Sequence, residues 1–443
     1  MDTKQYRRPF NIQVETISPV SIGNGEILSP YSDFVFDKDA ARIHILDKEL
    51  LTLQTVEKDK TEGTSLMQEY IDGIYDSFDN NRATFNLSSF IEKESKLNTA
   101  AESLASYSIP YNGLHPKDRR EIKCTTKDGQ RPYIPGSTIK GAIKGAMLYD
   151  WFYNEEKETF NKLMLQTVAT YKKCQREIDG INQIARKDYV NRDDKMEIRR
   201  LKREMANKGG RALAKKFNDT INSLLTKNHF LFSKEFAHLR PTDSSLLTEK
   251  DLLFQSVYRM HYVKGTVTIP ANLEAIQPRK IMNFKLSIQR DFQHLSLQYL
   301  NRDQPIENIM DALNKFHKHN VDLELTLLEN NPWYDRARPG ERTVFLKYRD
   351  FLESLYDKME KVLPNEAYLC LGFGKSFFYN SIGMLVYDWD SSNAGLSEEE
   401  RSSFMQYCQL FFLGRDGQKN FPLTRTVTND GKAMGWVKFT WKQ

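Results

Sequence analysis

Apolar and polar residues alternate over short stretches in the first third of the chain, which is the period of half-buried strands. Residues 11–22 (NIQVETISPVSI) are rich in β-branched side chains and predict a strand that runs into a turn at Gly23-Asn24-Gly25. Further short strands are predicted at 33–36, 42–46 and 122–126. The intervening residues 47–107 predict several short helices, because their apolar positions recur at helical spacing.

The rest of the chain continues this mixture of strands and helices. Residues 151–229 are polar and helical in character, and we find no internal sequence repeat. Two helices are predicted at 306–319 and 342–363, the second of them clearly amphipathic. The predicted strands lie at 240–260, 264–276, 280–288, from Ala367 to the glycines at 372–374, and at the terminal GWVKFTWK sequence.

The segment Arg131–Leu148 (RPYIPGSTIKGAIKGAML) predicts a helix that follows a turn at Gly136. The hydroxyls of Ser137 and Thr138 can cap its first turn. Its apolar face and its basic face are then made by different residues: Ile139, Ile143, Ala146 and Met147 on one, Lys140 and Lys144 on the other. Gly141 and Gly145 each cost about 1 kcal/mol relative to Ala inside a helix, so we expect another backbone or a ligand to approach closely there.

A helix start with free amides, a hydroxyl and two flanking lysines is suited to bind an anion, either one phosphate or a phosphate chain. A packed helix with solvated lysines is an equally weighted alternative. The same two alternatives apply to residues 172–216, where fifteen Lys or Arg residues accompany seven acidic ones. These helices form either a solvated hairpin or a salt-sensitive surface for RNA.

A second glycine-rich stretch, Gly372-Phe373-Gly374-Lys375-Ser376, follows the apolar strand near the end of the chain. Its GKS sequence is not a Walker A motif, because Leu369 stands where the first glycine would be. A GxGxxG motif also fails, since Phe377 occupies the third glycine position. The stretch therefore predicts a loop that can approach a phosphate closely, without the geometry of an NTPase.

Composition and charge limit the classes of protein that fit. The chain has 443 residues, 40% of them hydrophobic, and a net charge of +5, which permits a nucleic-acid partner without requiring one. No apolar run approaches the ~18 residues of a membrane span, and the N-terminus lacks the apolar core of a secretory signal. The four cysteines are far apart and contain no CxxC pair, which fits a reducing cytoplasm and argues against zinc or disulfide frameworks.

Four segments resemble the RAMP superfamily, the RNA-binding proteins of CRISPR systems. They are TISPVSIGNGEILSPYSDFVF, PGSTIKGAIKGAM, the glycine loop at 372–376 and the MGWVKF ending, and they occur in the expected order. The resemblance implies an α+β fold of two ferredoxin-like (RRM-like) RAMP domains with large helical insertions. We expect an N-terminal domain at 1–265, with insertions at about 47–110 and 151–230, and a C-terminal domain at 266–443.

The first and last of these segments are most similar to the subunit that caps the backbone of type III-A (Csm-type) CRISPR effectors. Such a subunit is expected to bind the 3′ part of the guide RNA (crRNA), to contact the backbone RAMP subunit and the small helical subunit, and to help host nucleases trim the guide. One alternative is a RAMP endoribonuclease that processes or cleaves RNA. Another is a purely structural subunit that contacts only protein.

We expect neither a catalytic site nor a metal or other cofactor. No HExxH, GxSxG or paired-carboxylate motif is present, and His317 and His319 would point to different faces of their helix. His44 and Asp33 are the residues that the nuclease alternative would use. The residues expected to contact RNA, some of them in a β-hairpin thumb, are Gly23, Gly25, Gly136, Ser137, Thr138, Lys140, Lys144, Arg240, Lys264, Arg279, Lys280, Gly372, Gly374, Lys375 and Ser376.

Overall fold

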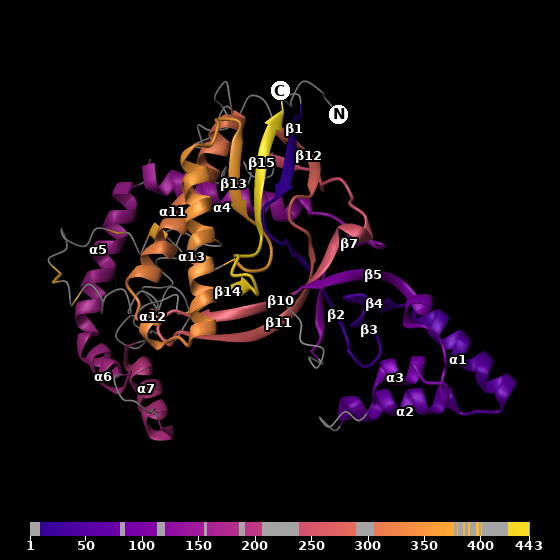
Figure 1. Cartoon of the computed structure of the whole chain (residues 1–443). Coiled ribbons are helices and arrows are strands. Elements are labelled where there is room, and N and C mark those ends of the chain that lie inside the picture. Colours follow the sequence, from indigo (N-terminus) through magenta and orange to yellow (C-terminus); the bar gives the residue numbers. More distant parts are fainter. Residues whose placement is uncertain are drawn as a thin grey trace.

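The computed structural model shows two curled sheets, with helices packed against them and extending to either side (Figure 1). The predicted α+β class is therefore confirmed. The structure describes residues 9–79, 85–112, 120–154, 157–185, 191–205, 239–288, 305–375, 379, 384–385, 389, 396–397, 400 and 424–442.

Within the described residues, the first sheet has five antiparallel strands that come from both ends and the middle of the chain. Their spatial order is β13 (Glu366–Cys370), β15 (Trp436–Lys442), β1 (Phe10–Thr16), β12 (Ile281–Ile288) and β9 (Leu239–Pro241). Side chains alternate between its faces, so that Ile12 and Val14 of β1 are buried while Asn11 is exposed. The buried face packs against α4 (Gly136–Asn154) and α11 (Pro305–Glu329).

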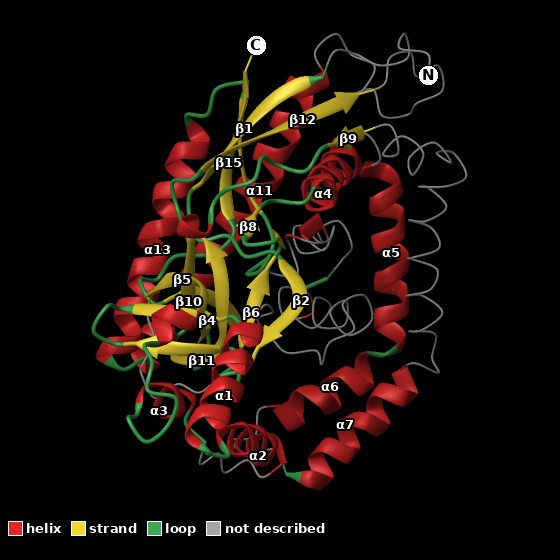
Figure 2. Cartoon of the chain, turned by 90° about the vertical axis from the view of Figure 1, so that its right-hand side faces the viewer, coloured by secondary structure: helices red, strands yellow, loops and turns green. Residues whose placement is uncertain are grey.

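The second sheet, as far as the chain is described, has eight strands and lies below the first in both views (Figures 1 and 2). Seven follow the order β2 (Gly23–Leu28), β6 (Ile122–Thr125), β11 (Thr266–Ile276), β10 (Leu252–His261), β5 (Ala105–Asn112), β4 (Arg42–Leu46) and β3 (Phe34–Asp37). The eighth, β14 (Thr424–Thr428), pairs with β10. A small hairpin, β7 (Lys127–Asp128) with β8 (Arg131–Pro132), leads into α4.

The two helical insertions lie on opposite sides of the sheets in Figure 1. The first contains α1 (Lys48–Glu62), α2 (Leu66–Asp79), α3 (Leu87–Glu92) and a 3-10 helix (Ala101–Leu104), which share a separate small core. The second contains α5 (Lys157–Lys173), α6 (Gln175–Ala185) and α7 (Arg192–Met205). The described residues also form α12 (Trp333–Arg336), α13 (Pro339–Glu360), which runs beside α11, and a 3-10 helix at Glu249–Asp251.

Several predicted boundaries differ from the structure. The first strand ends at Thr16, and the glycine turn expected at 23–25 is instead the irregular start of β2, where the register with β6 shifts. The helix expected at 306–319 continues to Glu329. The domain boundary expected at 265/266 falls in the turn between β10 and β11, and both sheets combine strands from either side of it. The division into two domains stays a prediction.

Candidate nucleic-acid interface

The start of α4 is held by a residue from another part of the chain. The Gly136 N–H donates a hydrogen bond to Asp243 Oδ1 over 2.6 Å, and a carboxylate is favourable at this end of a helix. A Cβ on Gly136 would lie 2.6 Å from the Pro241 carbonyl oxygen, so only glycine fits. Ser137 and Thr138 lie inside the first turn, so their predicted role as the cap preceding the helix is wrong. Their contact with RNA, like that of Gly136, stays a prediction.

The outer face of α4 is open, in contrast to its apolar face. Ile139 and Ile143 are buried in the core beneath the five-stranded sheet, as the pattern predicted. A Cβ built on Gly141 or Gly145 would meet no atom within 4 Å. Close approach by another segment of the described chain therefore does not explain these glycines. A ligand backbone can come near the helix axis here, because no side chain of the described residues lies within 4 Å of either Cβ position.

Three of the predicted cations meet beside this open face. Burial first, and then the positive charges of Arg240 and Lys144, lower the pKa of the Lys140 ammonium. Arg240 extends from β9, the edge strand next to the start of α4, and Lys144 lies one turn further along the helix. Like charges held near one another repel, and a polyanion bound beside them reduces this repulsion. We name Lys140, Lys144 and Arg240, with Gly141 and Gly145, the α4 cationic face.

The glycine-rich loop after β13 is packed against protein backbone. Gly372 has φ +65°, and a Cβ there would lie 2.2 Å from the Ser21 carbonyl oxygen. The N–H of Phe373 donates to that same oxygen over 2.7 Å. A Cβ on Gly374 would lie 3.0 Å from Met434 Cβ. The close approach that these glycines allow is thus to their own chain, and their contact with RNA stays a prediction.

A buried ion pair that the sequence did not reveal supports this loop. The Arg425 guanidinium lies 3.2 Å from Glu324 Oε1 and donates a hydrogen bond to the Gly374 carbonyl over 2.6 Å. Arg425 and Glu324 are 3% and 2% exposed, so the pair is shielded from solvent. Burial lowers the pKa of the neighbouring Lys375 ammonium. Ser376, the last predicted contact of this loop, lies outside the described residues.

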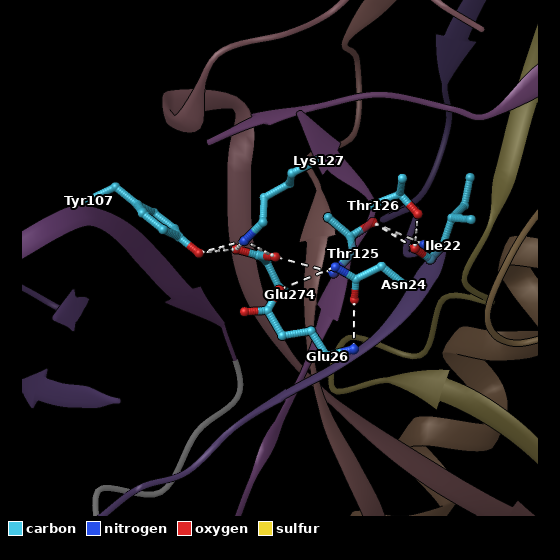
Figure 3. A network of polar contacts seen from close by, with 8 residues as sticks. All are labelled: Ile22, Asn24, Glu26, Tyr107, Thr125, Thr126, Lys127 and Glu274. Atoms are coloured by element: carbon cyan, nitrogen blue, oxygen red, sulfur yellow. Dashed lines mark hydrogen bonds and ion pairs between the residues drawn. The ribbon is translucent and has the colours of Figure 1, made fainter. Parts of the chain in front are cut away.

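Strand β2 presents the other open glycines. Gly23 and Gly25 are exposed, and a Cβ on either would meet nothing within 4 Å. Ile22, the residue just before β2, is fixed by two hydrogen bonds. Its N–H donates to Thr125 Oγ1 over 3.0 Å, and its carbonyl accepts from the Thr126 hydroxyl over 2.8 Å (Figure 3). Among the described strands, β2 pairs only with β6, so it is an edge of the sheet as described.

A buried polar network fixes the sheet beside these hydrogen bonds (Figure 3). The Lys127 ammonium donates to Glu274 Oε1 over 2.9 Å and to the Tyr107 hydroxyl over 2.6 Å. The Thr125 N–H donates to Glu274 Oε2 over 3.2 Å. Burial, followed by the charge of Glu274, raises the pKa of Tyr107 far above its usual range. These side chains therefore join β5, β6, β11 and the start of β7.

The other predicted cations are distributed more widely. Lys264 is exposed at the β10–β11 turn, but this turn packs against α12, where a Cβ on Gly265 would lie 2.6 Å from the Ala337 nitrogen. Arg279 is exposed with φ +64°, whereas Lys280 pairs with Asp251 at 2.7 Å. The β10–β11 turn is therefore fixed against the body of the protein instead of projecting as a free thumb.

The two residues of the nuclease alternative have structural partners. His44 is 2% exposed, with Nδ1 2.7 Å from the Ser108 hydroxyl and Nε2 3.4 Å from Asp37. Asp33 is 6% exposed, accepts the Ser29 N–H and pairs with Lys48 at 2.6 Å. Among the described residues, no cluster of three or more His, Cys, Asp or Glu side chains could hold a metal ion.

The basic helices are described up to Met205. Exposed cations recur every fourth residue along α7, at Lys195, Arg199 and Arg203. Arg200 is instead neutralised by Glu197 and Glu204. Both interpretations of this surface, solvation and RNA binding, stay open.

Comparison with known proteins decides the family. A model described as the RAMP superfamily matches residues 13–379, which include most of both sheets, the α4 cationic face and the glycine-rich loop. The chain belongs to the RAMP superfamily. No helix in the described part of the chain is both long enough and apolar enough to cross a bilayer.

Individual relatives point to one branch of the superfamily. The chain is 24% identical to "CRISPR system Cms protein Csm5" of Methanocaldococcus jannaschii, over 97% of this chain and 88% of that protein. Its fold is similar to the crystal structure of T. onnurineus Csm5, with a TM-score of 0.52, 20% identity and coverage of 96% and 99% of the two chains. A chain of a Csm–crRNA–target RNA ternary complex of a type III-A system also matches, with a TM-score of 0.56, 20% identity and coverage of 98% and 100%.

Proposed function

We propose that this protein is an RNA-binding subunit of a type III-A (Csm) CRISPR complex that caps the backbone filament and binds the 3′ part of the crRNA. Membership of the RAMP superfamily and similarity to Csm5 over 97% of the chain support the assignment to the complex. The observation that carries RNA binding is the α4 cationic face, which combines clustered positive charge with open glycines. Its partners are then crRNA, the backbone RAMP subunit and the small helical subunit.

The binding that this face supports does not depend on base sequence. Lys140, Lys144 and Arg240 neutralise phosphates, and Gly141 and Gly145 let the sugar–phosphate backbone approach the helix closely. The exposed glycines of β2 offer a second place of the same kind. A guide-binding subunit needs this tolerance, because spacer sequences differ from one guide to the next.

In this proposal the protein does not itself cut RNA. It supports maturation of the crRNA 3′ end by deciding how much of that end is exposed to host nucleases in the cytoplasm and how much is protected from them. The structural partners of His44 and Asp33 argue against the endoribonuclease alternative, since neither side chain is accessible as a general base or acid.

The first experiment is a gentle purification of the tagged protein from its native host, followed by sequencing of the RNA that accompanies it. The expected result is guide RNAs of stepped lengths, accompanied by other Csm subunits. The variant K140E/K144E is expected to retain RNA about tenfold less, because each exposed charge contact contributes up to ~1 kcal/mol and 1.4 kcal/mol corresponds to tenfold.

The matched control is K60E/K93E, which reverses two exposed lysines in the first helical insertion. It changes the net charge by the same amount and is expected to retain RNA normally. Equal retention by K140E/K144E and the control would remove the α4 cationic face from the RNA site. Protein that brings Csm subunits but no RNA would instead support the purely structural alternative.

A further inference from the structure

The five-stranded sheet has a second face, which α4 and α11 do not cover. Near β13 this face packs against α13, because Tyr368 and Cys370 share a core with Phe345 and Leu352. Toward β1, β12 and β9 its side chains are exposed or half-buried and almost entirely polar: Asn11, Gln13, Asn283, Lys285, Ser287 and Arg240. We name this region the open sheet face.

Strand register arranges these side chains in rows that cross the strands. Asn11 of β1 lies opposite Lys285 of β12 on one side and Lys442 of β15 on the other, so the three share a row. The next row holds amides and a hydroxyl: Asn283, Gln13 and Thr440. The described structure shows no ion pair at Lys285 or Lys442, both of which are exposed.

Acidic side chains lie at the far end of this face. Glu15 is four residues along β1 from Asn11, a distance of about 13 Å at ~3.3 Å per residue. Glu366 is neutralised by Lys438 at 2.5 Å. On the described part of this face, the row of Lys285 and Lys442 is therefore set apart from Glu15 and Glu366 and forms a positive band.

This band is continuous with the α4 cationic face around the edge strand β9. Arg240 lies opposite Ser287 in the sheet, one diagonal step from Lys285. The same Arg240 is near enough to Lys140 to contribute to the lowered pKa of its ammonium. The positive charges thus run from Lys144 and Lys140 through Arg240 and Lys285 to Lys442. From β9 to β15 this crosses three strand spacings, about 14 Å in all.

We propose that single-stranded RNA bound at the α4 cationic face continues around β9 and across the open sheet face. Lys285 and Lys442 hold its phosphates, and the amides of Asn11, Gln13 and Asn283 bond 2′-hydroxyls or base edges. The two rows contain no aromatic side chain, so bases are not stacked on the sheet as they are on aromatic RNA platforms. This inference rests on the proposed function and extends its RNA site to a second surface.

The chemistry of the face favours RNA over a protein partner. The centres of protein interfaces are enriched in aromatic and apolar side chains and depleted of lysine. Among the described side chains of this face, Ile281 at the acidic end is the one large apolar residue that is exposed, at 55%. Lysines and amides with no apolar centre fit a hydrated polyanion, for which counterion release supplies much of the binding free energy.

The test measures the salt dependence of binding, with the purified full-length protein and a short uridine-only RNA as the probe. Each phosphate neutralised on a single strand contributes about −0.7 to the slope of log K against log salt. The variant K285Q/K442Q removes two such contacts and is expected to make the slope less steep by about 1.4, or twice 0.7. The control K60Q/K93Q removes the same charge elsewhere and is expected to leave the slope unchanged.

The variant K140Q/K144Q separates this inference from the proposed function. If it flattens the slope and K285Q/K442Q does not, RNA binds at α4 and the sheet path is wrong. If neither variant changes the slope, both proposals fail.

Ultraviolet cross-linking of the wild-type complex, followed by mass spectrometry, provides a second measurement that needs no variant. RNA adducts on peptides containing residues 10–16 or 281–288 support the path. Adducts restricted to α4 peptides, or a protein subunit cross-linked to this face, overturn it.

Discussion

A buried histidine gives this protein a specific dependence on acid. His317 of α11 is 1% exposed, and its ring lies among Phe316, Tyr379 and Trp436. Its Nδ1–H donates to the Leu313 carbonyl over 2.9 Å, within the same helix. Burial is the main cause that lowers the pKa of His317 to about 3, from an ordinary value of about 6.5.

The sign of the effect follows from this lowered pKa. Below about pH 6.5 the unfolded chain binds a proton at His317 and the folded chain does not. The free energy of unfolding therefore falls as the pH falls. The loss approaches 1.36 kcal/mol per pH unit until the pH nears the folded pKa. Between pH 7 and about pH 4.5, His317 alone therefore removes about 2.5 kcal/mol of stability.

Replacing the histidine with an apolar ring isolates this contribution. The variant H317F loses the hydrogen bond to Leu313, about 1 kcal/mol at pH 7, but keeps the ring packing. Urea unfolding at pH 7 and about pH 4.5, followed by tryptophan fluorescence, gives the loss of stability on acidification for each protein. Wild type is expected to lose about 2.5 kcal/mol more than H317F, since all other titrating groups are common to both. Equal losses would refute a proton-excluding site at His317.

Two further predictions concern the polar groups that fix the candidate site. K127M leaves the carboxylate of Glu274 buried without its charged partner and is expected to cost about 3–5 kcal/mol, whereas K127M/E274Q costs less than the sum of the two single changes. Hydrogen exchange in β2 and β6 checks this, and additive costs would show that the pair does not act as a unit. D243A removes the acceptor at the start of α4 and is expected to lower stability by about 1–2 kcal/mol, measured as faster exchange in the first turn. D243N, which keeps an oxygen acceptor, serves as its control.

The local pattern of apolar and polar residues was sufficient to predict which side of an element is buried, where the apolar residues all lie on one face of it. The alternation around Val14 predicted β1, and the spacing of Ile139 and Ile143 predicted the buried side of α4, because a strand or helix places such residues on one face regardless of its neighbours. The ends of elements were predicted less well. The first strand stops at Thr16 because its hydroxyl and carbonyl bond the turn at 277–280, which is 261 residues away in the sequence.

Interactions between distant segments could not be predicted in this way. Asp243 bonds Gly136 across 107 residues, and Lys127 meets Glu274 across 147. Nothing near Lys280 in the sequence indicates that Asp251 neutralises it. Which charges remain available for a nucleic acid therefore depends on tertiary partners, and a list of cations chosen from the sequence includes some that the fold has already used.

The glycines show most clearly how the fold divides residues that look alike in sequence. Gly136 and Gly372 face backbone oxygens of their own chain at distances that exclude a side chain. The lack of a Cβ at these two positions therefore allows close packing within the protein. Gly141 and Gly145, only a turn or two beyond Gly136, face open space beside Lys140. One signature segment thus performs two tasks: its first glycine sets the helix against β9, and its later glycines keep the outer face clear. Because the first task fixes α4 next to Arg240, packing at the start of the helix is what assembles the charges at which we propose RNA binds.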